Sequence, residues 1–483
     1  MKHTSSLSHL VGVISAQGVD GDEEKPEDPR PERKLSYPSQ EWGIQLDKIT
    51  AAIEAEEFDS AKEMLDRQLE RTRRWTDREL AIFHQRYLDL ALLTFDYELA
   101  LEQAEKVLEY REDISYNTEE RVLWTVGTIY TRDDFEGQDF EKALDYLQQN
   151  LDLKLDWEET SDDYAFIGAI YNFLNDFYKV EEWMLRATAK AIEEGKKVKS
   201  TWWEQLWQAY RVLADELMDS PTERDSYLQK ALNLSQFLVL SEIEEKEFWT
   251  KMASDYAKIA AVATESNEDA GPVGLEAYYT IEAAYHFGLY EEAGEYKNVF
   301  SVLRVQGVEN RAAMVYKEGL DLEIVERNFD NLFEYGEALY YSTDLERAAE
   351  VYEQAVDYKE DATVLQTLTN LHLLLDNFEE CISFADRALN ATEGELGDET
   401  DQARIKYDKG VCQFYNDDLD ESETTMEELR EEIGNDSDHD VLERLWNSAG
   451  QYLDLIKAER KRIQYKKDVD EAWREYEESK KRS

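Results

Sequence analysis

Cysteine is nearly absent from this chain of 483 residues, which has only Cys381 and Cys412. Two cysteines exclude a disulfide framework and a zinc ribbon, but they do not fix the redox compartment. Both fall inside helical patterns, and Cys381 takes the small-residue position of a recurring phrase described below. A buried thiol packs like a small hydrophobic side chain. We therefore expect two structural, unbridged cysteines rather than a disulfide.

Basic side chains are also scarce. There are 54 Lys and Arg against 110 Asp and Glu, which gives a formal net charge of -56. This excess repels nucleic acids and anionic lipid surfaces, so neither is an expected partner. It also destabilises a compact state unless salt screens it, and adaptation to a saline environment is the simplest explanation. A dedicated cation site would need a D-x-D-x-D-G loop, which the sequence lacks.

The motifs that carry most catalytic chemistry are missing. The sequence has no G-x-G-x-x-G, Walker A, H-E-x-x-H, G-x-S-x-G or paired C-x-x-C motif. Its six histidines are scattered, and its many glutamate pairs at helical spacing are typical of solvated helix faces. We therefore expect a non-enzymatic protein without a cofactor or a metal site.

Proline and long apolar runs are rare, which bears on the ends of the chain. Four of the six prolines lie between Pro26 and Pro38, and residues 17–40 are predicted to be an acidic, proline-containing disordered tether. No run reaches 18 apolar residues, so no membrane span is expected. Residues 1–16 have the features of a weak secretory signal peptide. A merely flexible N-terminus is the alternative.

What the chain does have is a repeated phrase, an aromatic residue or leucine followed three residues later by a small residue. Through much of the chain it recurs at intervals of 33 to 43 residues. Such a period indicates stacked units of two helices, A and B, each too small to bury its own apolar face. The phrases are Phe58/Ala61, Tyr97/Ala100, Phe140/Ala143, Phe177/Val180, Tyr290/Ala293, Leu345/Ala348, Phe378/Cys381 and Leu419/Ser422.

The predicted fold is therefore all-α, an α-solenoid of stacked antiparallel helix pairs. It spans residues 41–460 with about ten pairs and is irregular at 215–275. A closing helix A pattern around Trp446 and Leu453 predicts a C-terminal capping helix. Residues 461–483 continue as a polar, locally basic helix or tail. The irregular segment leaves room for an alternative, an enzyme or regulator with an unrecognised site in 215–275.

Several units match the tetratricopeptide repeat (TPR) consensus at more than one position. One match comprises Leu332, Gly336, Leu339, Leu345, Ala348, Tyr352 and Ala355, and another comprises Tyr164, Ile167, Gly168, Tyr171 and Phe177. The chain thus resembles TPR proteins. In such a unit the glycine lets helix A approach helix B, and the helix B aromatic fills the interior of the pair.

Within that superfamily the chain resembles the bacterial periplasmic TPR proteins associated with TonB-ExbB-ExbD energy-transduction systems. The matching stretches are 201–215, 278–300 and above all 307–356, GVENRAAMVYKEGLDLEIVERNFDNLFEYGEALYYSTDLERAAEVYEQAV. The resemblance implies a periplasmic scaffold or adaptor that takes part in TonB-dependent uptake. A cytoplasmic TPR adaptor with an unrelated protein partner is the alternative.

The repeat register also predicts where a partner binds. Helix A positions that alternate with the packing positions line the concave surface of such an array, and aromatic side chains with asparagine suit an extended peptide. Trp203 and Trp207 share one helical face and are expected in the core, which turns Trp202 to the surface. The candidate partner-binding residues are Trp124, Trp202, Phe333, Glu337, Tyr340, Asn370, Tyr407 and Phe414.

Overall fold

The structure is a computed structural model that describes residues 28–69, 71–265, 273–391, 399–434 and 439–482. These residues form helices joined by short turns, and the predicted all-α class is confirmed. The predicted signal peptide, residues 1–16, and the first part of the predicted tether lie outside the described residues. No described helix is both long enough and apolar enough to span a bilayer.

The chain divides into two compact units, Met1–Val212 and Leu213–Ser483, and helix α9 spans the division. The first unit holds α1 (Gln40–Glu54), α2 (Phe58–Leu69), α3 (Asp77–Leu93), α4 (Tyr97–Glu109), α5 (Tyr116–Tyr130), α6 (Phe140–Leu153), α7 (Ser161–Phe173), α8 (Phe177–Glu193) and most of α9 (Ser200–Glu216). The second holds α10 (Pro221–Ser241), α11 (Lys246–Glu265), α12 (Val273–His286), α13 (Ala293–Val305), α14 (Glu309–Asp321), α15 (Phe329–Tyr341), α16 (Leu345–Tyr358), α17 (Ala362–Leu374), α18 (Phe378–Asn390), α19 (Glu399–Tyr415), α20 (Leu419–Ile433) and α21 (Asp440–Arg482).

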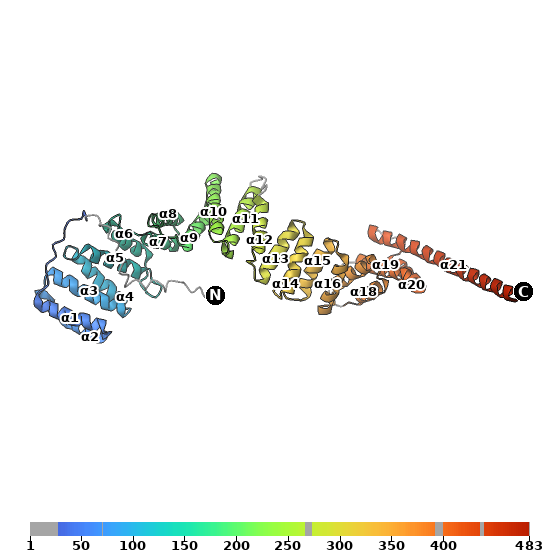
Figure 1. Cartoon of the computed structure of the whole chain (residues 1–483), viewed down its shortest axis with the longest axis horizontal. Coiled ribbons are helices and arrows are strands. Elements are labelled where there is room, and N and C mark those ends of the chain that lie inside the picture. Colours follow the sequence, from blue (N-terminus) through green and yellow to red (C-terminus); the bar gives the residue numbers. More distant parts are fainter. Residues whose placement is uncertain (1–27, 70, 266–272, 392–398, 435–438, 483) are drawn as a thin grey trace. The chain divides into compact units, whose positions relative to one another are not determined.

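Consecutive helices pack as pairs, and each pair stacks on the next within its unit. The closest packing joins α3 to α4, α5 to α6 and α7 to α8 in the first unit, and α11 to α12, α15 to α16, α17 to α18 and α19 to α20 in the second. In Figure 1, α13 to α16 follow one another side by side in chain order. One apolar core runs through α3–α8 and another through α13–α19. The predicted α-solenoid of stacked helix pairs is confirmed.

A glycine on helix A sets the distance within a pair, as the repeat pattern predicts. A Cβ atom added to Gly336 on α15 would lie 2.7 Å from the Tyr352 ring on α16, and one added to Gly127 on α5 would lie 2.7 Å from Leu147 on α6. Tyr352 is 3% exposed and fills the interior of its pair. The missing side chain on one helix therefore makes room for the large side chain on the other.

The turn from helix A to helix B has its own local chemistry. The residue two positions before helix B has a positive φ, although it is not glycine, at Glu56, Phe95, Asn175, Thr343, Asp376 and Asp417. The next residue caps helix B in several units. The carboxylate of Asp96 accepts from the Leu99 amide at 3.1 Å, and that of Asp176 accepts from the Lys179 amide at 3.1 Å. Such a cap stabilises the helix by about 1 kcal/mol, which offsets much of the strain before it.

The segment 215–275, predicted to be irregular, consists of helices like the rest of the array in its described part. The helices α10 and α11 are longer than their neighbours, with 21 and 20 residues, and α11 packs on both α10 and α12. The irregularity is therefore one of helix length. This regular packing argues against a separate catalytic or regulatory domain in residues 221–265.

The expectation of two unbridged cysteines is wrong. Cys381 on α18 and Cys412 on α19 form a disulfide, with Cα atoms 6.3 Å apart. Both residues are fully buried, as the packing argument expected. Their separation of 31 residues is close to one repeat, so both side chains face the contact between α18 and α19. The bridge ties one pair to the next.

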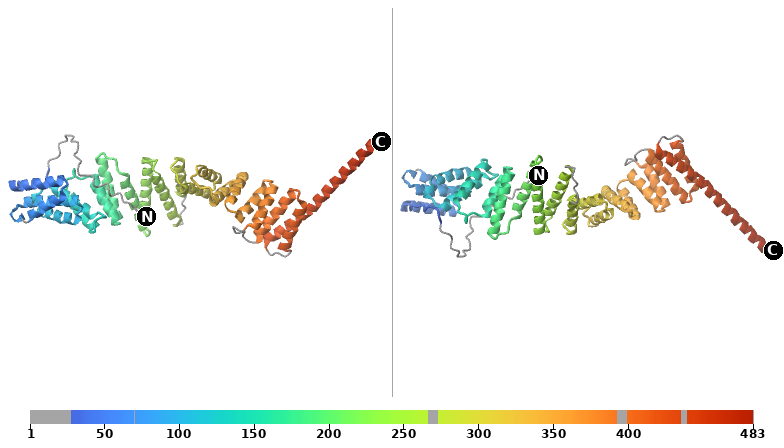
Figure 2. Two further views of the ribbon diagram at one scale, coloured as in Figure 1. Left: turned by 90° about the horizontal axis from the view of Figure 1, so that it is seen from below. Right: turned by 90° about the horizontal axis from the view of Figure 1, so that it is seen from above.

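The C-terminal end is a single helix of 43 residues, α21, whose first part caps the array. Ala449, Leu453 and Ile456 are buried against α19 and α20. The Arg430 guanidinium of α20 lies 3.8 Å from the centre of the Trp446 ring, and Arg460 pairs with Glu423 at 2.5 Å. Beyond this contact the helix continues alone, as the red C-terminal end shows in Figure 2. The predicted cap and the predicted polar tail are thus one continuous helix.

We expect Gly336→Ala to lower the free energy of unfolding by about 1–3 kcal/mol, because the added methyl group overlaps the Tyr352 ring. Gly294→Ala on α13 is the matched control, since nothing lies within 4 Å of its added Cβ. That control should be neutral or stabilise by up to about 1 kcal/mol. Urea unfolding followed by circular dichroism measures both. Equal effects of the two substitutions would contradict this account of the glycine.

Candidate functional site

A groove of about 860 Å³ lies between α13 and α15, the A helices of two successive pairs. It therefore lies on the side of the array where the repeat register predicts partner binding. Its walls combine aromatic and charged side chains, which suits an extended polypeptide better than a small apolar ligand. The lining residues are Lys297, Phe300, Ser301, Arg304, Val305, Glu309, Asp330, Phe333, Glu334 and Glu337.

Two of the predicted partner-binding residues, Phe333 and Glu337, line this groove. Leu332, Tyr335, Gly336, Ala338 and Leu339 of the same helix are buried, whereas Phe333, Glu334 and Glu337 are half-buried and line the groove. The centre of the Phe333 ring lies 5.9 Å from that of the buried Tyr352, so the two rings pack against each other. Half-buried aromatic side chains held in this way keep their orientation and lose little entropy on binding.

Arg304 is the main cation of the groove. Its guanidinium pairs with Glu309 at 3.0 Å and with Glu337 at 3.1 Å, and it lies 5.5 Å from the centre of the Phe300 ring. Burial opposes its charge, but the ion pairs with Glu337 and Glu309 outweigh burial and raise the pKa of Arg304. The side chain therefore stays charged and fixes one wall of the groove.

The residues that line the groove carry more negative than positive charge. The lining has two basic residues, Lys297 and Arg304, and four acidic ones. Glu334 accepts a hydrogen bond of 2.5 Å from the Tyr316 hydroxyl, whose pKa is raised by burial and by this carboxylate. Asp330 is exposed at the groove edge. A ligand segment with lysine or arginine would meet complementary charge here.

The other predicted residues of the second unit lie on neighbouring A helices. Tyr340 is half-buried beside the groove, 5.6 Å from the Tyr341 ring, and Asn370 is half-buried on α17. Tyr407 and Phe414 on α19 meet Tyr452 of α21 edge-on, at 5.9 and 5.6 Å between ring centres. The capping helix therefore covers part of this surface, and both rings belong partly to the core.

The two predicted tryptophans of the first unit differ in burial. Trp124 is half-buried under Phe166, with ring centres 5.2 Å apart. Trp202 was expected at the surface and is only 7% exposed, so this prediction is wrong. Trp202 shares the packed face of α9 with Leu206, four residues on, whereas Trp203 and Trp207 are half-exposed.

An N-terminal strap, residues 28–39, lies along the first unit and is the described part of the segment 17–40, which the sequence predicts to be a disordered tether. Arg30 pairs with Glu120 at 3.0 Å and with Glu158 at 3.1 Å, and Arg33 pairs with Glu119 at 2.7 Å. Composition alone predicted disorder here. A signal was present in the spacing of the two arginines, since residues three apart lie on one side of an extended, proline-rich chain.

Tyr116, at the start of α5, is the centre of the contact with the strap. The guanidinium carbons of Arg30 and Arg33 lie 4.5 and 3.9 Å from the centre of its ring. Its hydroxyl donates to the Pro31 carbonyl at 3.1 Å. Cation–π contacts and ion pairs thus hold an extended arginine-bearing segment against a helix pair of this array.

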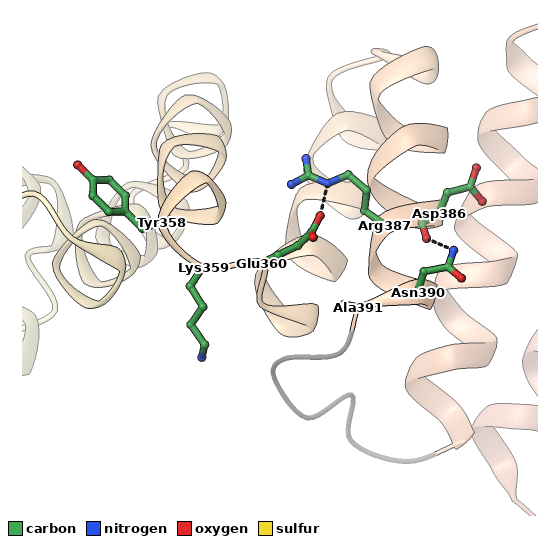
Figure 3. A pocket seen from close by; sticks show the side chains of 7 residues that line it. All are labelled: Tyr358, Lys359, Glu360, Asp386, Arg387, Asn390 and Ala391. Carbon is green, nitrogen blue, oxygen red and sulfur yellow. Dashed lines mark hydrogen bonds and ion pairs between the residues drawn. The ribbon is translucent and has the colours of Figure 1, made fainter.

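A second hollow, of about 480 Å³, lies between the ends of α16 and α18 (Figure 3). Arg387 points toward Glu360 and pairs with it at 2.8 Å, and Asn390 donates to the Asp386 carbonyl. Tyr358 and Lys359 point away from this pair. The charged groups at the centre of the hollow satisfy each other, so it offers a ligand little.

Comparison with known proteins gives a fold likeness only. No family model matches the chain, and no curated protein matches it. It is similar to the C-terminal part of a TPR repeat-containing protein from Cytophaga hutchinsonii, at 14% identity and a TM-score of 0.32, over 65% of this chain and 95% of that one. It is also similar to a tetratricopeptide repeat protein from Parabacteroides merdae, at 14% identity and a TM-score of 0.30, over 69% of this chain and 99% of that one.

A third similar structure is the TPR2AB domain of yeast Sti1, described in complex with pHSP90. The identity is 13% and the TM-score 0.23, over 69% of this chain and 99% of that one. All three structures are TPR proteins. TM-scores this low support no argument about partners.

Asp408 on α19 is a buried carboxyl group, and its burial can be tested through the pH dependence of stability. Asp408 is 8% exposed, and burial raises its pKa to about 6. In the unfolded chain its pKa is about 3.9. The free energy of unfolding therefore falls as the pH rises from about 4 to about 6, because the unfolded chain ionises this carboxyl group more easily than the folded protein does. We expect Asp408→Asn to increase the free energy of unfolding by about 1–3 kcal/mol at pH 8 and by about half as much at pH 5. Urea unfolding at both values checks this, and a gain independent of pH would point to packing instead.

Proposed function

We propose that this chain is a non-enzymatic scaffold that holds an extended, basic segment of a protein partner on its A-helix surface. The observation that carries the proposal is the groove between α13 and α15, which combines Phe333 and Phe300 with four carboxylates. Aromatic side chains supply contact area, and carboxylates select for lysine and arginine. The acidic field of the whole chain attracts such a segment from a distance.

The N-terminal strap supports this choice of ligand. Arg30 and Arg33 dock beside Tyr116 and three glutamates, so the chain already binds one extended basic segment, its own. The α13–α15 groove has the same combination of aromatic rings and carboxylates. Farther along, Asn370 on α17 could hydrogen-bond an extended backbone that continues past the groove.

The proposal also specifies a compartment, the periplasm, and a partner system, the TonB-ExbB-ExbD machinery. A disulfide between Cys381 and Cys412 favours an oxidising compartment, such as the periplasm, over the cytoplasm. The sequence resemblance over 278–356 favours the TonB-ExbB-ExbD machinery as the partner system. A cytoplasmic adaptor with an unrelated partner is the competing hypothesis.

Selection of peptides displayed on phage against the full chain tests the ligand chemistry. We expect the selected peptides to carry lysine or arginine next to aromatic residues. Phe333→Ala or Asp330→Lys should weaken their binding about tenfold, because the first removes contact area and the second reverses charge in the groove. Glu350→Lys, the same charge change at an exposed position on α16, is the matched control. Acidic peptides, or equal losses in the control, would exclude this groove as the site.

Fractionation of native cells tests the compartment. We expect the chain in the periplasmic fraction, shortened at its N-terminus, with no thiol that reacts under denaturing, non-reducing conditions. An intact Met1 in the cytosol together with two reactive thiols would support the cytoplasmic adaptor instead. A photoreactive residue at position 333 should then link the periplasmic protein to a TonB-system component, and one at the exposed Met314 of α14 should not.

A further inference from the structure

The outer half of α21, from residue 461 onward, is exposed and nevertheless carries large apolar side chains. Within the described chain, residues from 461 onward are almost all exposed. Tyr465 is 71% exposed, Trp473 62% and Tyr476 57%. A polar cap needs no such residues, because exposing aromatic rings on a solvated helix gains nothing and favours association.

Tyr465 and Tyr476 belong to a heptad pattern, whereas Trp473 lies outside it. Leu455, Ala458, Tyr465, Val469, Ala472 and Tyr476 occupy positions separated alternately by three and four residues, except that Arg462 replaces an apolar residue in one place. This stripe differs from the face that packs on the array, which carries Leu453 and Ile456. A stripe with this period is the seam of a coiled coil.

The charges along the same segment divide into two opposite halves. Residues 457–466 contain five basic residues and one acidic residue, and residues 468–477 contain five acidic residues and one basic residue. Two copies running parallel would place like charges against each other along the whole segment. Two antiparallel copies centred on Lys467 would place each basic half against an acidic half.

The antiparallel register also matches side-chain size across the seam. With Lys467 at the centre, Ala458 faces the second copy's Tyr476, and Tyr465 faces its Val469. Arg462 faces Ala472, where its aliphatic stem can pack while the guanidinium reaches the edge. Large side chains then meet small ones in every layer, as close packing requires.

Three like-charge pairs face each other across the two copies, Glu459 with Glu475, Arg460 with Arg474 and Lys467 with Lys467, and all three lie off the seam. Two of these groups are already paired within the chain, because Glu459 binds Arg462 and Arg460 binds Glu423 of α20. The 21 residues from 457 to 477 span about 31 Å, so the two capped arrays lie at opposite ends of the paired segment and do not collide.

We propose that the outer half of α21 is a homodimerisation helix that pairs with the same helix of a second copy in antiparallel orientation. The partner is a second copy because this segment is complementary to itself in charge and in size. The inference is independent of the peptide groove, which lies on α13 and α15. It gives each dimer two widely separated A-helix surfaces.

Light scattering on the full chain during size-exclusion chromatography tests the dimer. We expect twice the chain mass, and we expect Val469→Lys to weaken the dimer about tenfold or more, because it places a charge in the seam. Gln464→Lys introduces the same side chain on the outer face of the helix. It is the control and should leave the dimer intact. A monomer at high micromolar concentration would overturn the proposal, and so would a dimer unaffected by Val469→Lys.

Disulfide trapping tests the orientation. Ala458→Cys mixed with Tyr476→Cys should give a crosslinked dimer, whereas Ala458→Cys alone should not, because equal positions lie about 27 Å apart in the antiparallel register. Crosslinking of Ala458→Cys to itself would indicate a parallel pair and overturn the register. Binding of a monomeric chain to phosphatidylglycerol vesicles, lost in Val469→Lys, would assign the stripe to a membrane surface instead.

Discussion

The close approach of helix A to helix B is the constraint on which the rest of the structure depends. At Gly336 the missing side chain admits the ring of Tyr352, and the same exchange of small for large recurs in other pairs. This contact fixes the rotation of helix A about its own axis. On α15 one face, with Leu332, Tyr335 and Leu339, is then used for packing, and the other face, with Phe333 and Glu337, lines the groove. The groove that contains Phe333 and Glu337 is therefore a consequence of core packing, and its chemistry is free to vary without loss of the fold.

Several of the few basic residues form ion pairs that connect separate segments of the chain. Arg30 and Arg33 fasten the N-terminal strap, Arg304 ties α13 to α15 through Glu337, and Arg460 fastens α21 to α20. In a chain with 110 acidic residues, each cation finds carboxylates nearby, so a single arginine can neutralise two of them. The acidic surface that remains is the same surface that would receive a basic partner.

The fold and part of the site could be predicted because both follow from periodicity. Counting from Gly336 predicted Phe333 and Glu337 on the same helix surface, and both line the α13–α15 groove. Trp202 was misplaced because the spacing of Trp203 and Trp207 suggests that they mark the core face. Trp202 and Leu206 have the same spacing on a face about 100° away, and that is the face that is buried. Periodicity describes single helices and gives no distances between them.

The remaining errors come from contacts that join separate segments. The link between Cys381 and Cys412 depends on how two successive pairs stack, and the docking of Arg33 on Glu119 joins residues 86 apart. Composition predicted a disordered tether over residues 17–40, but a segment that cannot form a core of its own can still bind to a neighbouring surface, as residues 28–39 do.

The distribution of charge also decides where copies of this chain can meet. Two bodies this acidic repel each other over about a Debye length, roughly 8 Å at physiological ionic strength. Residues 457–483 carry ten basic residues against seven acidic ones, whereas the rest of the chain carries 44 basic and 103 acidic residues. Because α21 extends beyond the cap, its outer half lies away from the other acidic surfaces of its unit. Association through this helix therefore avoids the repulsion that any contact between the bodies would meet, and it leaves the A-helix surfaces open to a partner.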